Sequence, residues 1–449
     1  MSEIPGDGLA PDPEAQAHGW RPAALTPGIL RLLDDVEQRL AGNPERAARV
    51  RTYVTSLIRD ATLRHLDGRT FVLTGDIPAM WLRDSTWQYR PLLAAAPGDP
   101  ETLELIAGLC RHQAACVLAD PYANAFTLHP GIASQHHDFA QQHPLVWERK
   151  YELDSLAAVL DLAARLWRVT GFTGHLDLTF RQAARRIVEV ITAEQHHDRD
   201  SYRLHRPHAP ARDSLSHDGR GAPCAPVGLS WSGFRPSDDA CQLPYLIPAN
   251  AAAVVGLRGL ADVAGQVWRD QALSVRARRL AEEIDRAITE YGLVTGPLDE
   301  PIWAYEVDGR GAQLLTDDAN IPSLLSLPYL GYCSPSQPRY LATRRFLLSS
   351  AHPGYIVGSR ARGLGSPHTP EGYVWPLAIA MAALTQQDAA TTQAALACLE
   401  DTDAGTGRLH ESFDANDPAK FTRAWFSWPE MTYVHLVLHS LATDASTHY

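Results

Sequence analysis

Apolar residues recur at helical spacing along most of this chain, and that periodicity limits its possible folds more than any other feature. Residues 249–263 and 374–384 are apolar almost all round, which indicates helices buried on every side. The spacing and length of the patterns predict helices over residues 27–40, 47–66, 85–96, 101–118, 153–169, 174–194, 248–264, 266–291, 319–330, 338–349, 371–385, 388–400 and 429–441.

Alternation typical of β-strands is scarce. Residues 69–74 are one candidate strand, and residues 302–305 with 313–315 are expected to form a small hairpin. About a dozen helices with long loops between them predict an all-α protein, an (α/α)6 barrel or toroid of six helical hairpins. Its inner and outer rings would leave a pocket among the loops at one end. Two stacked helical bundles are the alternative.

The chain offers no linker that divides it. We expect residues 1–25 to be disordered or loosely packed and residues 26–449 to form a single domain. Residues 196–227 are rich in His, Arg and Pro, and we interpret them as an insertion or lid between helices.

Charge and cysteine usage narrow the class of protein. A formal net charge of −12 argues against nucleic acids and anionic membrane surfaces as partners. The six cysteines have no CxxC spacing, so we expect free thiols in a reducing compartment. Residues 1–16 lack the features of a signal peptide, and no long apolar run predicts a membrane span. We therefore expect a soluble cytoplasmic protein, whose oligomeric state the sequence leaves open.

The stretch WSGFRPSDDA, residues 231–240, carries the strongest chemical signal. A glycine and a proline break any helix there, so Asp238 and Asp239 lie in a loop. Two abutting carboxylates repel each other, which raises one pKa and leaves a proton available for general acid catalysis. A solvated Asp–Asp turn is the alternative interpretation of the pair by itself.

Five other loops carry carboxylates and aromatic side chains, and four of them add arginines or histidines. They are residues 75–88 with Trp81, Arg83 and Asp84, residues 146–154 with Glu148 and Arg149, residues 317–329 with a second Asp–Asp pair, residues 365–375 with His368 and Glu371, and residues 410–428 with Glu411 and Trp425. Helix capping alone would account for Asp84 and for the second Asp–Asp pair.

Six such loops together favour a carbohydrate ligand. Indole faces stack on sugar C–H surfaces, charged side chains form paired hydrogen bonds with hydroxyls, and two carboxylates serve as acid and base. The chain has no GxSxG elbow, no HExxH motif and no glycine-rich phosphate loop. The Asp–Asp pairs also lack the further aspartate of a magnesium-diphosphate site.

From about residue 30 to the C-terminus, the chain resembles glycoside hydrolase family 125, the metal-independent exo-α-1,6-mannosidases. The resemblance rests on AMWLRDS (79–85), DPYANAF (120–126), VWERKYELDSL (146–156), SGFRPSDDA (232–240), DDANIPSLLSLPYLGY (317–332), GSPHTPEGYVWP (365–376) and HESFDANDPAKFTRAWF (410–426). It implies an (α/α)6 catalytic domain that needs no cofactor or metal. It also implies an inverting mechanism that removes terminal mannose from α-1,6-linked mannosides, such as one branch of N-glycans.

The resemblance also implies roles for individual residues. Asp238 or Asp239 would be the general acid, with Asp238 favoured, and Glu411 the general base. The implied or inferred substrate contacts are Arg83, Asp84, Glu148, Arg149, Arg235, His368 and Glu371 for hydroxyls, with Trp81, Trp231 and Trp425 as stacking faces.

Two segments depart from the family pattern. The turn PEMTYVHL, residues 429–436, stands where a small residue and an asparagine are expected, and residues 205–220 are longer and more basic than expected. Three alternatives stay open: a glucosidase on the same toroid, a calcium-dependent α-mannosidase, and an inactive sugar-binding toroid.

Overall fold

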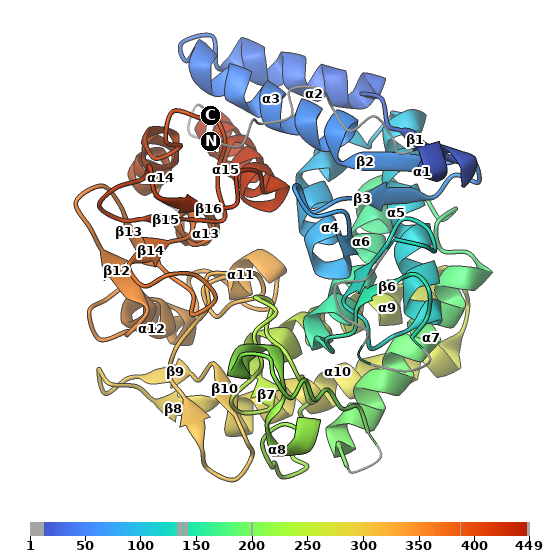
Figure 1. Cartoon of the computed structure of the whole chain (residues 1–449), viewed down its shortest axis with the longest axis vertical. Coiled ribbons are helices and arrows are strands. Elements are labelled where there is room, and N and C mark those ends of the chain that lie inside the picture. The colour runs from blue at the N-terminus through green and yellow to red at the C-terminus, as the bar shows by residue number, and fades with distance from the viewer. Residues whose placement is uncertain (1–12, 133–137, 139–141, 199–200, 387, 447–449) are drawn as a thin grey trace.

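The computed structural model describes residues 13–446, apart from 133–137, 139–141, 199–200 and 387. In this part of the chain, helices alternate between an outer and an inner ring (Figure 1). The outer helices are α3 (Pro44–Asp60), α5 (Pro100–Ala119), α7 (Leu178–Ala193), α10 (Gln271–Tyr291), α12 (Pro338–Leu347) and α14 (Ala389–Asp401). The inner helices are α4 (Leu82–Tyr89), α6 (Leu153–Thr170), α9 (Ile247–Gln266), α11 (Leu327–Leu330), α13 (Pro376–Leu384) and α15 (Ser427–Ser446).

Contacts between neighbouring inner helices form the ring. Helix α4 packs against α6 and α15, α9 packs against α6 and α11, and α13 packs against α15. This arrangement is the predicted (α/α)6 barrel rather than two stacked bundles. Three further helices lie outside the two rings: α1 (Pro13–Ala17), α2 (Pro27–Arg39) and the short α8 (Ser216–Gly219).

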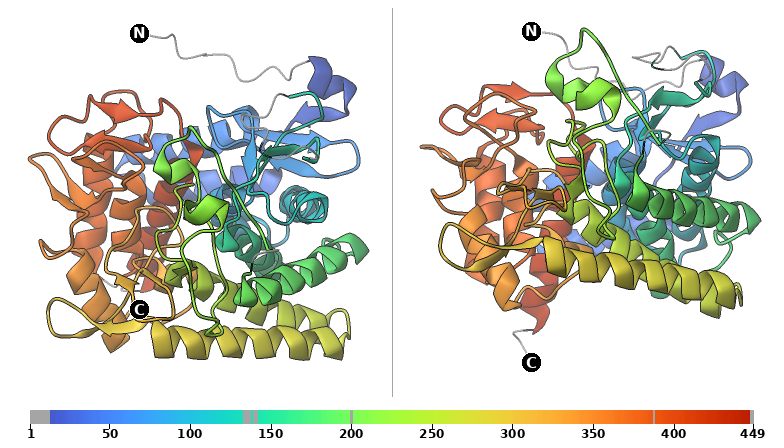
Figure 2. Two further views of the ribbon diagram at one scale, coloured as in Figure 1. Left: turned by 60° about the horizontal axis from the view of Figure 1, so that its bottom comes forward. Right: turned by 90° about the horizontal axis from the view of Figure 1, so that it is seen from below.

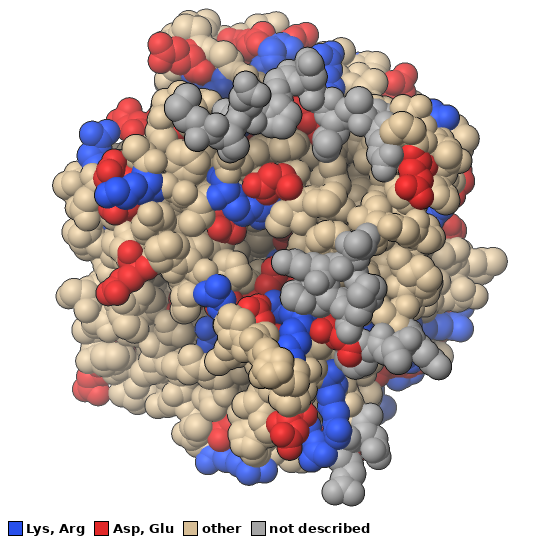
Figure 3. Space-filling view, in the orientation of Figure 1, with Lys and Arg blue, Asp and Glu red and all other residues tan. Residues whose placement is uncertain are grey.

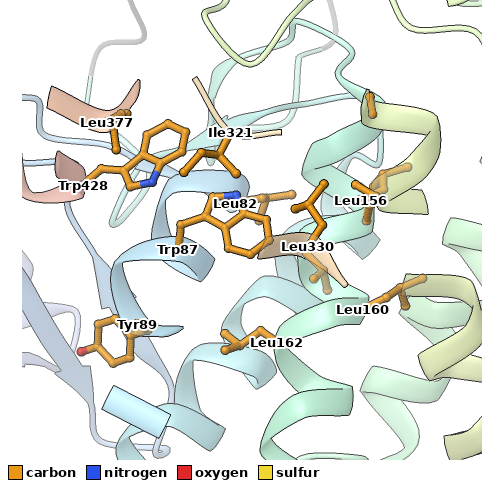
Figure 4. Packing of buried hydrophobic residues seen from close by; sticks show 14 of the residues in the cluster. Leu82, Trp87, Tyr89, Leu156, Leu160, Leu162, Ile321, Leu330, Leu377 and Trp428 are labelled. Carbon is orange, nitrogen blue, oxygen red and sulfur yellow. The ribbon is translucent and has the colours of Figure 1, made fainter. Parts of the chain in front are cut away.

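The inner helices are buried on nearly all sides because the outer ring covers them. Every residue of α4 is buried, and one main hydrophobic core runs through the described residues. In Figure 4, Leu82 and Trp87 of α4 lie between Trp428 on one side and Leu156 and Leu330 on the other. Helix α9 is long and apolar enough to cross a membrane by composition, but 83% of its apolar window is buried in this fold. Burial on all sides in the inner ring is enough to explain this apolar composition.

The two rings begin their helices differently. Asn43, Asp99, Asp177, Asp270 and Asp388 cap α3, α5, α7, α10 and α14 with side-chain hydrogen bonds to backbone N–H groups. The inner helices α4, α6, α9, α11 and α13 have no such side-chain cap, and neither does the outer helix α12. The first residues of the inner helices are therefore available for contacts at the end of the barrel.

Short antiparallel strands hold the loops together in two- and three-stranded sheets. The sheets are β1 (Trp20–Pro22) with β2 (Thr62–His65) and β3 (Thr70–Val72); β4 (Met80–Trp81) with β5 (Ala125–Phe126) and β6 (Val146–Glu148); β7 (Tyr245–Leu246) with β10 (Glu306–Val307) and β11 (Gln313–Leu314); β8 (Leu293–Thr295) with β9 (Pro301–Trp303); β12 (Tyr355–Val357) with β13 (Arg362–Leu364); and β14 (Tyr373–Val374) with β15 (Ser412–Asp414) and β16 (Phe421–Thr422). Figure 2 shows β14–β16, β1–β3 and the segment around α8 at the same end of the barrel.

Several sequence-based expectations differ from the structure; the helix predicted over 371–385, for example, begins only at Pro376, after strand β14. The hairpin expected between residues 302–305 and 313–315 is shifted along the chain. Its first strand is β10, which pairs with β11, and the N–H of Tyr305 donates to the carbonyl of Leu314 at 2.9 Å, whereas β9 pairs with β8. Within residues 319–330 only Leu327–Leu330 is helical, since two prolines and the side-chain contacts of Asp317 shape a loop instead. The helix predicted over 47–66 ends at Asp60, where the chain continues into β2.

The N-terminal segment is more ordered than expected in its described part. Residues 1–12 lie outside the described residues. Residues 13–22 form α1 and β1, and β1 pairs with β2. Trp20 is buried with its ring 5.9 Å from that of Phe71, so burial of one indole fixes this segment to the barrel.

Candidate active site

A cavity of about 280 Å³ lies where the inner helices begin. It is at the lower end of the size range of small-molecule sites. Figure 3 shows it as a hollow near the centre of one face, with acidic and basic side chains around it. Its lining comes from five of the six predicted loops: Thr74, Ile77, Trp81, Arg83, Asp84, Pro236, Ser237, Asp238, Asn320, His368, Trp375, Glu411, Arg423, Phe426 and Trp428.

Strand pairing and helix starts bring these loops together. Strand β4 pairs with β5 and β5 with β6, which places Trp81 beside Ala125 and Ala125 beside Glu148. Strand β14 pairs with β15, which joins the loop of His368 to the loop of Glu411. Short strands of this kind fix loop positions without adding a layer to the barrel.

The loop that contains Asp238 and Asp239 is a tight turn. Phe234 bridges to Ala240, and the backbone N–H of Arg235 donates to the carbonyl of Asp239. Asp238 adopts a left-handed backbone conformation with φ of 65°. Aspartate tolerates this region better than most residues, and here it turns the two neighbouring side chains in different directions.

Asp238 faces the cavity, and three N–H donors hold one of its oxygens. Its Oδ1 accepts from Trp81 Nε1 at 3.2 Å, from Asn124 Nδ2 at 3.1 Å and from Arg83 Nη2 at 3.5 Å. Asp239 is buried, does not line the cavity, and its Oδ1 lies 2.9 Å from His368 Nδ1. The structure therefore separates the neighbours: Asp238 contacts the cavity, and Asp239 orients a histidine that does.

The fully buried guanidinium of Arg83 is surrounded by carboxylates. Arg83 Nε donates to Asp84 Oδ1 at 3.1 Å, and its Nη1 lies 2.5 Å from Glu152 Oε2 and 3.6 Å from Asp154 Oδ2. With Asp238, four carboxylates share this one cation. A single positive charge cannot neutralise four carboxylates in a buried site, so some of them must retain protons.

The pKa shifts in this cluster follow from that imbalance. Burial raises the pKa of Glu152 well above its ordinary value, although Arg83 opposes the shift. Burial likewise raises the pKa values of Asp84 and Asp154 to about 6. Burial also acts to raise the pKa of Asp238, but Arg83 and a hydrogen bond from Glu152 outweigh it and bring the pKa to about 2.

Two further groups that line the cavity, His368 and Glu411, belong to the loops after α12 and α14. Among the described residues, the Glu411 carboxylate has one ion pair, with Arg423 Nη1 at 4.0 Å. Arg423 is held in turn by Asp76 and by the carbonyl of Thr74. Burial lowers the pKa of His368, but the contact with Asp239 outweighs it and raises the pKa above its ordinary value.

Three predicted contact residues lie outside the cavity lining, and their roles as substrate contacts stay predictions. Trp231 is buried with its ring stacked 3.8 Å from that of His197, so its face is not available to a sugar. Arg235 is buried with its Nε 2.6 Å from Glu306 Oε1. Arg149 pairs with Asp120 at 2.5 Å.

Three others lie near the cavity or on the surface without lining it. Glu148 is buried and contacts Lys150 Nζ at 3.5 Å and Arg206 Nη1 at 3.4 Å. Glu371 is exposed. The Trp425 ring packs against Arg408, whose guanidinium carbon lies 5.4 Å from its centroid. All three residue types can contact a sugar, but in the fold Glu148 and Trp425 contact other side chains.

The sequence reasoning missed several residues that line the cavity or hold its acid. Trp375, Phe426 and Trp428 line it from the starts of α13 and α15, while Asn124 and Glu152 lie directly behind Asp238. The sequence signal that could have identified these residues is their position at the start of an inner helix, which Arg83 and Asp84 share.

The two departures from the family pattern have structural explanations. In the turn PEMTYVHL, Glu430 points to Arg408 at 3.1 Å rather than to the cavity. The basic segment contacts two of the loops: Lys150 Nζ of residues 146–154 donates to Asp213 Oδ1 at 3.0 Å, and Ala240 N of the acid loop donates to the carbonyl of Arg212. These contacts join the segment to the loop of Asp238 and to the loop of Lys150.

Comparison with known proteins agrees with this geometry. Residues 46–438 match the model of the metal-independent α-mannosidases, GH125. The meiotically up-regulated gene 157 protein of Schizosaccharomyces pombe is 36% identical over 92% of this chain and 85% of that protein. A Streptococcus pneumoniae metal-independent α-mannosidase is also similar, and its structure is a non-productive complex with α-1,6-mannobiose. The two chains are 43% identical, and the match covers 92% of this chain and 98% of that one. They superpose with a TM-score of 0.90. A bacterial glucoamylase bound to acarbose is 14% identical and shares the fold. It superposes with a TM-score of 0.53 over 81% of this chain and 49% of that one.

Proposed function

This chain belongs to the metal-independent α-mannosidases of family GH125, and on that premise we propose that it is an inverting exo-α-1,6-mannosidase. One observation carries the proposal: Asp238 and Glu411 both line the same small cavity, with Trp81 and Trp428 beside them. Inverting glycosidases need one protonated and one ionised carboxyl group on opposite sides of the sugar ring.

We assign the general acid to Asp238. It lines the cavity, whereas Asp239 is buried against His368. The proton of Asp238 passes to the glycosidic oxygen as the bond from the anomeric carbon to that oxygen breaks. The leaving sugar thus departs as a neutral alcohol.

We assign the general base to Glu411. Its only ion pair among the described residues is the long one with Arg423, so its carboxylate is free to accept a proton from water. That water attacks the anomeric carbon from the face opposite the leaving oxygen, which inverts the configuration. The α-mannoside therefore gives β-mannose first.

The cavity supports exo action and recognition of a single terminal sugar. Its volume of about 280 Å³ suits one enclosed ring rather than an open chain. Arg83 and Asp84 form part of its wall and are held rigidly by each other, which suits paired hydrogen bonds to adjacent hydroxyls. The α-1,6 linkage is supported by the related Streptococcus pneumoniae protein, whose structure contains α-1,6-mannobiose.

Time-resolved proton NMR of α-1,6-mannobiose hydrolysis, in the presence of EDTA, tests the proposal. We expect β-mannose to appear first and then to mutarotate, with an unchanged rate when EDTA is omitted. Initial release of α-mannose would refute inversion, and faster cleavage of α-1,2- or α-1,3-mannobiose would refute the linkage. Binding of these mannosides without turnover would instead indicate an inactive sugar-binding toroid.

A further inference from the structure

We infer that Glu14, His18 and His129 form a binding site for a divalent transition-metal ion such as Zn²⁺, outside the cavity of the proposed active site. Bound there, the ion joins helix α1 to the loop that follows β5. The inference goes beyond the proposed function and does not depend on it, because none of the three side chains lines the cavity.

Two segments far apart in the chain bring the three side chains together. Glu14 lies in α1, and His18 follows the last residue of that helix. The N–H of His18 still donates to the carbonyl of Glu14 at 3.0 Å, which continues the helical hydrogen bonding. Residues four apart on a helix lie on the same face, so the carboxylate and the imidazole are neighbours. His129 is buried in the loop after β5 and supplies the third group.

The spacing of the three groups is close to that of a metal site. Each side chain offers one ligand atom, and these atoms all lie within 4.8 Å of one another. The rings of His18 and His129 are nearly parallel, at 13°, with centroids 4.9 Å apart. Ligands of a tetrahedral zinc are about 3.3–3.5 Å apart, so the ligand atoms must approach by at most about 1.5 Å. Glu14 and His18 are exposed, and rotation of their side chains supplies this movement.

The buried ligand, His129, is held in the way that metal-binding histidines are held. Its Nδ1 lies 3.0 Å from the carbonyl oxygen of Pro130, which can only accept, so Nδ1 carries the hydrogen. In the neutral ring the lone pair is then on Nε2, the atom that can bind a metal. Thr127 Oγ1 donates to the carbonyl of His129 at 3.3 Å and fixes the backbone of the loop. A backbone carbonyl commonly sets the tautomer and orientation of a histidine ligand in this manner.

Contacts of the strand that follows α1 hold the other two ligands in place. Trp20 of β1 is buried, and β1 pairs with β2, as Figure 1 shows beside α1. His65 Nε2 lies 2.9 Å from the carbonyl oxygen of His18 and positions that part of the backbone. Helix α1 has only 5 residues, too few for a helix to be stable by itself. An ion bound by α1 and His129 together therefore adds a cross-link to a segment that depends on such contacts.

The donor set selects the class of ion. Two imidazole nitrogens and one carboxylate oxygen suit Zn²⁺ and related first-row ions. Ca²⁺ and Mg²⁺ prefer oxygen ligands, so they are not the ions that this site prefers. Three protein ligands leave the fourth position of a tetrahedral ion to water. The site is separate from the proposed acid and base, so we expect its ion to stabilise the fold rather than to take part in hydrolysis.

Zinc titration of the full-length protein by isothermal calorimetry, after treatment with EDTA and removal of the chelator, tests the inference. We expect Zn²⁺ to bind in the micromolar range and to raise the Tm, since an ion that binds only the folded state stabilises it. Ca²⁺ at the same concentration should leave the Tm unchanged.

His18→Ala and Glu14→Gln are the diagnostic variants, because both side chains are exposed and their replacement should leave the fold intact. We expect each variant to weaken Zn²⁺ binding by more than the ~10–100-fold that loss of an outer-shell partner costs a metal site. The rise in Tm at micromolar Zn²⁺ should disappear. His208→Ala is the matched control: it removes an exposed histidine of the His-rich segment 196–227, outside this cluster, and should bind Zn²⁺ as the wild type does.

Co²⁺ reports the coordination directly, because its visible absorption is strong when the ion has four ligands and weak when it has six. We expect strong bands when Co²⁺ is added to the wild type and to His208→Ala, and weak bands in His18→Ala. Weak bands in all three proteins would contradict a site with three protein ligands.

A wild-type protein that does not bind Zn²⁺ in the micromolar range would overturn the inference. Binding that His18→Ala and Glu14→Gln leave unchanged would overturn it too. Loss of binding in His208→Ala would place the ion in the His-rich segment and refute the site at α1. The readouts are binding, melting and absorption, so each of these results leaves the proposed hydrolysis of mannosides standing.

Discussion

The chain contains two Asp–Asp pairs that look alike in sequence and differ completely in structure. Asp238 and Asp239 contact N–H donors and a histidine at the edge of the cavity. Asp317 and Asp318 are buried in the loop before α11, and among the described residues neither has an ion pair. Asp317 accepts hydrogen bonds from the backbone of Leu324 and Leu325, at 2.9 and 3.0 Å.

The difference shows that the charge around a carboxyl pair, and not the pair itself, decides its role. Burial raises the pKa of Asp317 to about 8, because no cation opposes it. Arg83 and Glu152 bring the pKa of Asp238 to about 2 in spite of burial. One pair therefore shapes a loop, and the other is connected to a proton-sharing cluster.

The largest expected effect separates the two pairs by activity. Asp238→Asn removes the proposed general acid, and kcat/KM for α-1,6-mannobiose should fall about 10³-fold. Asp317→Asn should leave kcat/KM close to the wild-type value, since Asp317 does not line the cavity. Steady-state kinetics of both variants decide the matter. A similar loss in both would mean that the pairs are functionally equivalent.

The next largest effect is expected at Arg83, the cation that contacts Asp238 but not Asp317. Arg83→Ala leaves the carboxylate cluster without its shared guanidinium, which should lower kcat/KM by about 10²-fold or more. The free energy of unfolding should fall by about 3–5 kcal/mol, the usual result of breaking a buried ion pair. Kinetics and urea denaturation measure both quantities. Near-normal kinetics would remove Arg83 from the site.

A smaller effect appears in the pH dependence of stability. The pKa of Asp317 is about 8 in the folded protein against an ordinary value of 3.8, so the folded state binds more protons between these pH values. Its contribution to stability is therefore complete below about pH 4 and is lost as pH rises towards 8, by at most about 1.4 kcal/mol per pH unit.

Asp317→Asn should remove this decrease of the free energy of unfolding with rising pH. Urea unfolding of the wild type and the variant across this pH range gives the difference between them. Buried histidines act in the opposite direction: burial lowers the pKa of His112 to about 3, so its contribution to stability grows as pH rises. These histidines are present in both proteins, so their effect cancels in the difference. Parallel stability curves would show that Asp317 does not titrate in this range.

The smallest effect on activity is expected at Trp231, which stands in the same loop as Asp238. Trp231→Phe keeps an aromatic ring against His197 and should leave kcat/KM unchanged, with stability lowered by about 1–3 kcal/mol. Trp81→Phe removes the N–H that donates to Asp238 and should reduce kcat. A loss of activity at Trp231 equal to that at Trp81 would return Trp231 to the list of substrate contacts.

Much of the fold was predictable, because inner and outer helices need different apolar patterns. The all-round apolar stretch in α9 predicted a helix buried on every side, and α9 lies in the inner ring. Residues 319–330 misled the prediction because their apolar side chains fill the core from a loop. A buried loop residue and a buried helix residue have the same composition.

The sequence by itself determined the barrel, the family and the set of loops that meet at one cavity, because helical periodicity and long motifs are local properties of the chain. Only the tertiary structure decided that Asp238 contacts the cavity, that Asp239 contacts His368, and that Glu152 lies behind them. The physical reason is that a side chain's protonation and orientation depend on neighbours far away in sequence. The single guanidinium of Arg83 sets those properties for four carboxylates drawn from three segments of the chain.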